Sequence, residues 1–172
     1  MRIVSVVGTK KSGKTTVVER LLPELRRRGL RVGTLKLIHH EGFTMHAEGR
    51  DTARHWDAGA DFSLAIAPGE TTLVRRSPGR HETLEEVRHL IPPGADVLVC
   101  EGLVVGGEDV RTVLCAWTEG ELRTLLAELP KDAHVVAASG EVAKDGDRVA
   151  GLVALDAGSE EDVRRLAGLV MG

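Results

Sequence analysis

Apolar residues follow two spacings along this chain. Short continuous runs rich in β-branched residues are typical of buried strands, whereas apolar residues three or four positions apart are typical of helices. Strands are predicted at residues 2–7, 31–38, 61–67, 71–74, 95–100, 111–117, 134–138 and, more weakly, 149–155. Helices are predicted at residues 14–28, 51–58, 83–91, 119–128 and 159–170. Strands that alternate with helices predict an α/β fold with a mainly parallel, doubly wound sheet.

Length and composition favour one globular domain over residues 1–172. The chain of 172 residues is long enough for one substantial core, and its 42% hydrophobic and 28% charged residues exclude a disordered protein. A net charge of −3 gives no general attraction to nucleic acid, and no apolar run is long enough to cross a membrane. Cys100 and Cys115 lie in apolar runs without a C-x-x-C pair, which predicts buried, reduced thiols and a cytoplasmic protein.

The most informative motif lies between the first predicted strand and the first predicted helix. Its sequence GTKKSGKT matches G-x-x-x-x-G-K-[ST] at every fixed position, which predicts a loop that binds nucleotide phosphates. The glycines permit a tight turn that aims backbone N–H groups at an anion, and the following helix adds its positive dipole end. The predicted nucleotide-binding residues are Gly8, Thr9, Lys10, Lys11, Ser12, Gly13, Lys14, Thr15 and Thr16.

Catalysis and metal binding are assigned to three residues at this loop. Lys14 is predicted to contact the β- and γ-phosphates, and the Thr15 hydroxyl is predicted to be a ligand of Mg²⁺. A second metal ligand is expected at the carboxyl end of a neighbouring strand, where ligands gather in open α/β sheets. Glu101 ends the buried run ADVLVCE and meets this condition, whereas Asp96 begins the same strand and belongs at its opposite end.

A second group of polar residues follows the strand predicted at 31–38. Four of the seven histidines, His39, His40, His46 and His55, fall between residues 39 and 55. Adjacent histidines on an extended backbone point apart, which disfavours a shared transition-metal ion. Contact with a phosphate or another substrate group is therefore the preferred interpretation, with these residues: Lys36, His39, His40, Arg50 and Asp51. His55 and the three remaining histidines are predicted to be surface residues: His55, His81, His89 and His134.

The segments GTKKSGKTT, LKLIHHE, EGRDTARHWDAGAD and VCEG together resemble the molybdopterin-guanine dinucleotide biosynthesis protein B family. That family carries a phosphate loop, a lysine followed by paired histidines, a G-[KR]-D-[ST] segment leading to A-G-A, and E-G after a buried strand. The matching residues beyond the loop are Lys36, His39-His40, Gly49-Arg50-Asp51-Thr52, Ala58-Gly59-Ala60 and Glu101-Gly102. The resemblance covers residues 1–105, and the histidine and G-R-D-T segments make it specific.

The resemblance implies a P-loop GTP-binding adapter with a three-layer P-loop NTPase fold and weak, Mg²⁺-dependent GTPase activity. Its cofactors would be GTP and Mg²⁺. It would assist the molybdenum cofactor guanylyltransferase that joins GMP to molybdopterin, forming the guanine dinucleotide form of the molybdenum cofactor. It would also form a homodimer built on an extended sheet.

Two positions depart from the family pattern. Leu37 stands where the family often has histidine, and Ser139-Gly140 stands where it usually has Ser-Asp. Ser139 is retained among the predicted nucleotide-binding residues. An acid at the second position would suit the guanine N1–H and amino group, so glycine there leaves the choice between GTP and ATP open. Glu141 is the acid that would replace it if the loop shifts by one residue.

Three other classes share part of the pattern. An ATP-dependent ligase of the dethiobiotin synthetase type carries E-G-x-G-G, loosely matched by Glu101-Gly102 and Gly106-Gly107, but it lacks the paired histidines. A small P-loop kinase needs an arginine-rich lid, for which Arg75, Arg76 and Arg80 are the candidates. A metallochaperone GTPase is disfavoured by the geometry of adjacent histidines.

Overall fold

The computed structural model describes residues 1–172 except 41, 46–49, 78 and 80–82. The chain divides into two compact units. The first, Met1–Leu37 together with Glu82–Gly172, is called the sheet unit below, and the second, Ile38–His81, is called the ribbon unit. That residues 1–172 form a single domain stays a prediction. Within the described residues, no helix has the length and apolar character needed to cross a membrane.

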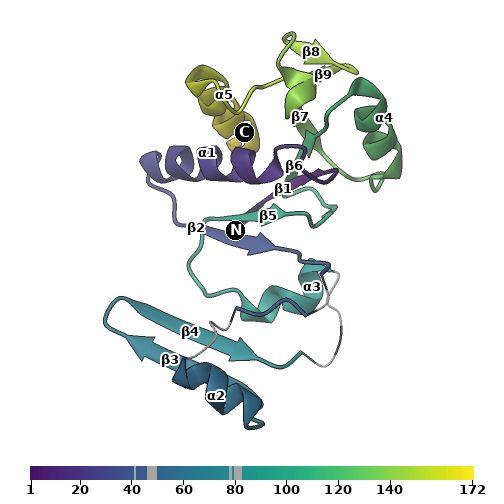
Figure 1. The fold of residues 1–172 in the computed structure, drawn as a ribbon. Coiled ribbons are helices and arrows are strands. Elements are labelled where there is room, and N and C mark those ends of the chain that lie inside the picture. Colours follow the sequence, from purple (N-terminus) through teal and green to yellow (C-terminus); the bar gives the residue numbers. More distant parts are fainter. Residues whose placement is uncertain (41, 46–49, 78, 80–82) are drawn as a thin grey trace. The chain divides into compact units, whose positions relative to one another are not determined.

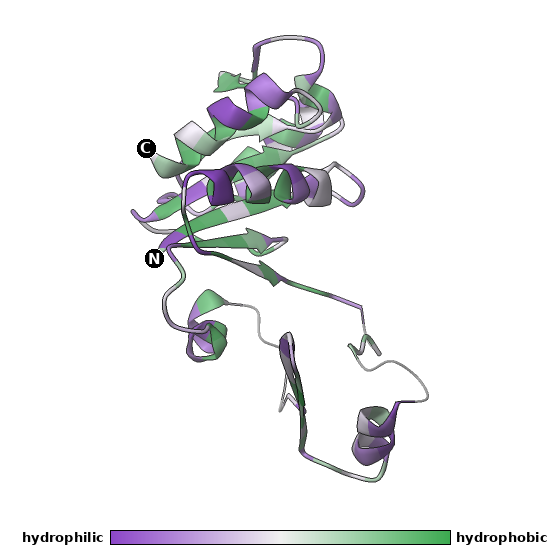
Figure 2. Cartoon of the chain, turned by 90° about the vertical axis from the view of Figure 1, so that its left-hand side faces the viewer, coloured by the Kyte–Doolittle hydropathy of each residue, from purple (hydrophilic) through white to green (hydrophobic). Residues whose placement is uncertain are grey.

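The sheet unit is built on a five-stranded parallel sheet with the order β2-β5-β1-β6-β7 (Figure 1). Its strands are β1 (Arg2–Gly8), β2 (Val32–Lys36), β5 (Val97–Glu101), β6 (Val110–Cys115) and β7 (Val135–Ser139). The inner strands are apolar along nearly their whole length, as Figure 2 shows, because both faces of the sheet are covered. This confirms the predicted α/β fold with a mainly parallel sheet.

Helices cover both faces of this sheet. They are α1 (Lys14–Arg27), α3 (Leu84–Val87), α4 (Glu119–Glu128) and α5 (Glu160–Met171), with the 3₁₀ helices η1 (Arg88–Leu90) and η2 (Glu141–Ala143). Successive residues of β1 point to opposite faces: Val4 and Val6 pack in the core shared with α1 and α5, and Ile3 and Val7 pack in cores shared with α3 and α4. Three layers result, as expected.

Two predicted elements differ from the observed ones. The helix predicted at 83–91 is α-helical only over its first turn, α3, and continues as η1. The single strand predicted at 149–155 is wrong: the chain forms a small antiparallel ribbon of β8 (Arg148–Val149) and β9 (Leu152–Val153). The turn between them holds Ala150 and Gly151 at φ 47° and 83°. Left-handed backbone is uncommon for alanine, so the apolar run concealed the turn.

The two cysteines are buried, as predicted. Cys100 lies in β5 and Cys115 in β6, and neither side chain is exposed. Burial raises the pKa of each thiol to about 12. Both thiols therefore stay protonated at neutral pH and act as small apolar core groups.

The ribbon unit consists of α2 (Asp51–Asp57) and the antiparallel strands β3 (Phe62–Ala67) and β4 (Glu70–Arg75). Arg76 ties the helix to the ribbon. Its guanidinium lies 4.2 Å from the Trp56 ring centroid and donates hydrogen bonds to the carbonyl oxygens of Ala60 (3.1 Å) and Trp56 (2.8 Å). Arg76 is thus occupied within the ribbon unit, which weakens its candidacy for a kinase lid, and Arg80 lies outside the described residues.

Candidate nucleotide-binding site

The predicted phosphate loop lies between β1 and α1, at the carboxyl edge of the sheet. Gly8, Lys11 and Gly13 all have positive φ, at 157°, 63° and 94°, and Gly13 is the N-cap residue of α1. A Cβ on Gly8 would lie 2.0 Å from the Cys115 carbonyl oxygen, so only glycine allows the loop to rest on β6. The Ser12 side chain is buried, and its hydroxyl donates to the Thr9 carbonyl oxygen at 2.8 Å.

The Lys14 side chain is hydrogen-bonded to the backbone of this loop. Its ammonium donates hydrogen bonds to the carbonyl oxygens of Gly8, at 3.0 Å, and Thr9. The cation is thereby held over the loop, where an entering phosphate would meet it. Lys10 and Lys11 are exposed, and Thr16 follows Thr15 in the first turn of α1. Every predicted residue of the motif thus lies at this one edge of the sheet.

Thr15 and Glu101 meet although they are 86 residues apart in sequence. Glu101 ends β5, the neighbour of β1 in the sheet, and is only 9% exposed. The Thr15 hydroxyl donates to Glu101 Oε1 at 2.8 Å, and Lys36 Nζ from β2 lies 2.9 Å from the same oxygen. Asp96 lies at the opposite end of β5, where it accepts a hydrogen bond from the Arg31 N–H.

The groups that meet here suit a hard cation. The carboxylate of Glu101 and the hydroxyl of Thr15 are oxygen donors, and Mg²⁺ is typically held by one or two carboxylates together with phosphates and water. No cluster of three or more His, Cys, Asp or Glu side chains capable of holding a metal occurs in the part of the chain that the structure describes. The residues therefore fit a magnesium site shared with phosphates.

A small pocket of about 170 Å³ adjoins the phosphate loop. The loop and Thr16 form one wall, and the others come from Trp117 after β6, from Gly140 and Glu141 after β7, and from residues 156–158. Ser139, a predicted nucleotide-binding residue, does not line this pocket: its side chain is fully buried, and its hydroxyl donates to the Leu155 carbonyl oxygen at 2.7 Å. Trp117 and residues 156–158 were not among the predicted site residues, although Trp117 ends one predicted strand and residues 156–158 directly follow another, which is the signal that identified Glu101.

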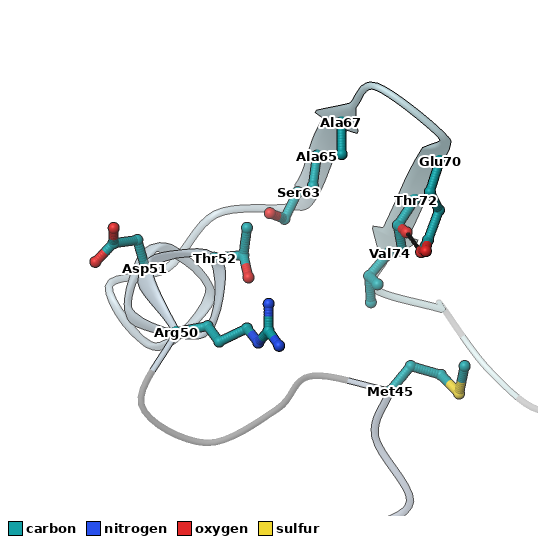
Figure 3. Close-up of a pocket in the computed structure, with 10 residues that line it drawn as sticks. All are labelled: Met45, Arg50, Asp51, Thr52, Ser63, Ala65, Ala67, Glu70, Thr72 and Val74. Carbon is teal, nitrogen blue, oxygen red and sulfur yellow. Dashed lines mark hydrogen bonds between the residues drawn. The ribbon is translucent and has the colours of Figure 1, made fainter.

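The remaining predicted residues belong to the ribbon unit. His39 and His40 are exposed. Arg50 precedes α2 and helps to line a pocket of about 710 Å³ between that helix and one face of the β3–β4 ribbon. Its guanidinium points into this space, whereas the Asp51 carboxylate is directed away from it (Figure 3) and pairs with Arg54 at 3.5 Å. Other positions named from the sequence, His46, Gly49 and His81, lie outside the described residues.

Known proteins resemble this chain in both sequence and fold. The family model described as molybdopterin guanine dinucleotide synthesis protein B matches residues 3–106. A probable molybdopterin-guanine dinucleotide biosynthesis adapter protein of Bacillus subtilis is 37% identical over 101 residues, covering 58% of this chain and 57% of that protein. The corresponding adapter protein of Haemophilus influenzae is 40% identical over 76 residues, covering 44% of this chain and 42% of that protein. The chain thus spans about half the length of these curated relatives.

The structural match extends further than the sequence match. The crystal structure of Bacillus subtilis MobB aligns with a TM-score of 0.73 and 26% identity, covering 98% of each chain. The phosphate loop, the paired histidines, the G-R-D-T segment and Glu101-Gly102 all lie inside the matched residues 3–106. The chain therefore belongs to the molybdopterin guanine dinucleotide synthesis protein B family.

Proposed function

We propose that this protein is a GTP-binding adapter with weak, Mg²⁺-dependent GTPase activity. It assists the molybdenum cofactor guanylyltransferase that attaches GMP to molybdopterin. The observation that carries this proposal is the phosphate loop with Thr15 set against Glu101, in a chain whose relatives are named as adapters of this pathway. The cytoplasm is the proposed compartment, because reduced thiols such as Cys100 and Cys115 persist there.

The phosphates of the nucleotide would bind in the loop between β1 and α1. The N–H groups of the loop and the N-terminal end of α1, a helix of 14 residues, provide partial positive charge at one point. The Lys14 ammonium would exchange its two carbonyl partners for phosphate oxygens, which are stronger acceptors because they carry charge. Binding would therefore replace the two carbonyl contacts of the Lys14 ammonium with stronger ones.

Thr15 and Glu101 are the residues that would hold Mg²⁺. When bound, the ion neutralises part of the charge on the β- and γ-phosphates. In the free protein Lys36 supplies the positive charge next to Glu101. Glu101 would also orient the attacking water, which would compete with Lys36 Nζ for the carboxylate.

The ribbon unit is the proposed contact region for the pterin phosphate or for the transferase that holds it. Arg50 offers a planar, permanently charged guanidinium inside a pocket of about 710 Å³, and such a group binds phosphate through two parallel hydrogen bonds. His39 and His40 add exposed imidazoles in the same unit. Nucleotide binding itself needs none of these side chains.

We expect Arg50→Ala and His40→Ala to bind GTP nearly as wild type does, yet to fail to stimulate guanine dinucleotide formation. The assay couples the variant to the guanylyltransferase, molybdopterin and GTP, with GTP affinity measured in parallel. Arg54→Ala is the matched control, because Arg54 lies in α2, the helix that directly follows Arg50, and its side chain is 79% exposed. Arg50→Lys keeps the charge without the planar fork and should restore only part of the stimulation. Full stimulation by both alanine variants would refute this role of the ribbon unit.

A homodimer is the proposed assembly, with a second copy covering the ribbon. Phe62, Leu64 and Ile66 of β3 are 62%, 52% and 78% exposed, and Leu73, which pairs with Leu64, is 56% exposed. These side chains form one apolar face. A two-stranded ribbon is only marginally stable alone, so a second copy packed against this face would stabilise it.

Charge placed on this face should dissociate the dimer. We expect wild type to show twice the monomer mass in light scattering, and the double variant Leu64→Lys, Ile66→Lys to show the monomer mass. Burial of lysine ammonium groups without partners is too costly for the interface to persist. Val104→Lys is the control, since Val104 is an apolar residue of the sheet unit that is 48% exposed. A monomeric wild type, or an unchanged dimer in the double variant, would contradict the assembly.

A further inference from the structure

The pocket of about 170 Å³ is placed where a nucleoside would leave the phosphate loop. It shares Ser12 and Gly13 with that loop, and Thr16 adds the next turn of α1. Trp117 lines the same pocket and is 47% exposed, so its ring offers an apolar surface against which a planar base can stack. The pocket is therefore the region from which the base of a bound nucleotide would be recognised.

An acidic residue, which the family usually has at position 140, does not fit in place of Gly140 in this structure. Its φ is 90°, and a Cβ there would lie 2.4 Å from the Ser12 carbonyl oxygen and 2.8 Å from that of Ala116. The turn after β7 therefore touches the backbone of the phosphate loop directly. The Ser139 hydroxyl is buried against Leu155. The Ser139-Gly140 pair thus offers the base no carboxylate.

Two other carboxylates line the pocket, and they differ in how firmly they are held. The Glu141 carboxylate pairs with Lys144 Nζ at 2.7 Å, and both side chains are about half exposed. Asp156 Oδ1 instead accepts the Gly158 N–H at 2.9 Å. The Asp156 N–H donates to Asp162 Oδ2 at 3.1 Å.

The backbone next to Asp156 is fixed as well. The Leu155 N–H donates to the Ala138 carbonyl oxygen at 3.0 Å, which ties this turn to β7, and the Ser159 N–H donates to the Asp156 carbonyl oxygen at 3.0 Å. Asp156 Oδ2 accepts no hydrogen bond from any residue that the structure describes. Asp156 is thus a carboxylate held in place with Oδ2 available to a ligand, and Oδ1 keeps a second lone pair beside the one that accepts the Gly158 N–H.

We propose that the Asp156 carboxylate recognises the base of the nucleotide and selects guanine, and that the base stacks against the Trp117 ring. This rests on the proposed nucleotide binding and adds to it the residue that chooses GTP over ATP. Guanine presents two adjacent donors, N1–H and the 2-amino group, which a carboxylate accepts together. Adenine presents an unprotonated N1 to the same carboxylate, so two acceptors would face each other and remain unpaired.

The test compares the binding of GTP, ATP and xanthosine triphosphate to wild type and to Asp156→Asn. Wild type should prefer GTP. In the variant, GTP should bind on the order of tenfold to a hundredfold more weakly, because a charge-assisted pair is lost. Xanthosine triphosphate should bind more tightly than to wild type, because the asparagine amide donates to the oxygen that xanthine carries at C2. Asparagine Oδ1 still accepts the Gly158 N–H, so the turn is preserved.

Two controls make the outcome decisive. Glu141→Gln should leave the preference for GTP over ATP unchanged. If Glu141→Gln loses this preference while Asp156→Asn keeps it, Glu141 is the residue that recognises the base, and the proposal is overturned. Tripolyphosphate with Mg²⁺ reports on the phosphate loop alone. Equal binding of GTP and ATP by wild type overturns base selection while the phosphate loop stands. Absence of binding by tripolyphosphate and by every nucleotide overturns both this proposal and the proposed function.

Discussion

Lys14→Met will bind GTP on the order of tenfold to a hundredfold more weakly than wild type, because a charge-assisted hydrogen bond is worth roughly 1.5–3 kcal/mol. Methionine keeps most of the aliphatic stem that passes through the loop and removes only the ammonium. Titration calorimetry of both proteins with GTP measures the difference. Lys131→Met is the control, since Lys131 is exposed and lies outside the loop.

The same titrations separate the phosphate contact from the metal contact. Thr15→Ala should lower GTP affinity chiefly when Mg²⁺ is present, because its hydroxyl is the proposed metal ligand, whereas Lys14→Met should lower it with and without the ion. GTP binding by Lys14→Met that equals wild type would remove the assignment of the phosphate loop.

Glu101→Gln is expected to bind GTP within a few-fold of wild type and to hydrolyse it on the order of a hundredfold to ten-thousandfold more slowly, the range of a lost acid–base group. Glutamine keeps an oxygen that can accept the Thr15 hydroxyl, so the contact between α1 and β5 survives. The lost pair with Lys36 should cost at most about 1 kcal/mol of stability, because the Lys36 side chain is 55% exposed.

Phosphate release in the presence of Mg²⁺ measures this effect, and Lys36→Gln is the matched control. Lys36→Gln breaks the same ion pair but leaves the carboxylate, so its turnover should stay closer to wild type. If Glu101→Gln and wild type hydrolyse GTP equally fast with the same Mg²⁺ dependence, another acid holds the ion.

In the free protein, the two lysine ammonium groups of the site are already paired with oxygen atoms of the chain. Lys14 rests on two loop carbonyl oxygens, and Lys36 rests on Glu101. These contacts satisfy groups that would otherwise be partly buried without partners. A triphosphate with Mg²⁺ offers stronger partners to the same residues, so binding exchanges contacts within a folded loop rather than ordering a disordered one.

The sequence alone predicted the features that depend on residues adjacent to one another in the sequence. The apolar runs identified all five strands of the sheet, and in β1 and β5 their continuous apolar character reflects burial on both faces. The spacing of glycine, lysine and threonine identified the phosphate loop, because positive φ at Gly8 and Gly13 is needed there whatever surrounds it. Glu101 was found because a polar residue at the end of a buried strand must lie at the sheet edge.

Tertiary structure decided which distant residues share the site. Nothing local specifies the order β2-β5-β1-β6-β7, which sets Glu101 beside Thr15 across 86 residues of sequence. The left-handed turn at Ala150 was likewise hidden, although it returns the chain so that the Leu155 N–H bonds to the Ala138 carbonyl oxygen and Asp156 reaches the pocket beside the phosphate loop. Strand order and such turns are decided by packing contacts between residues that are far apart in the sequence. These contacts leave no periodic pattern of apolar residues from which they could be predicted.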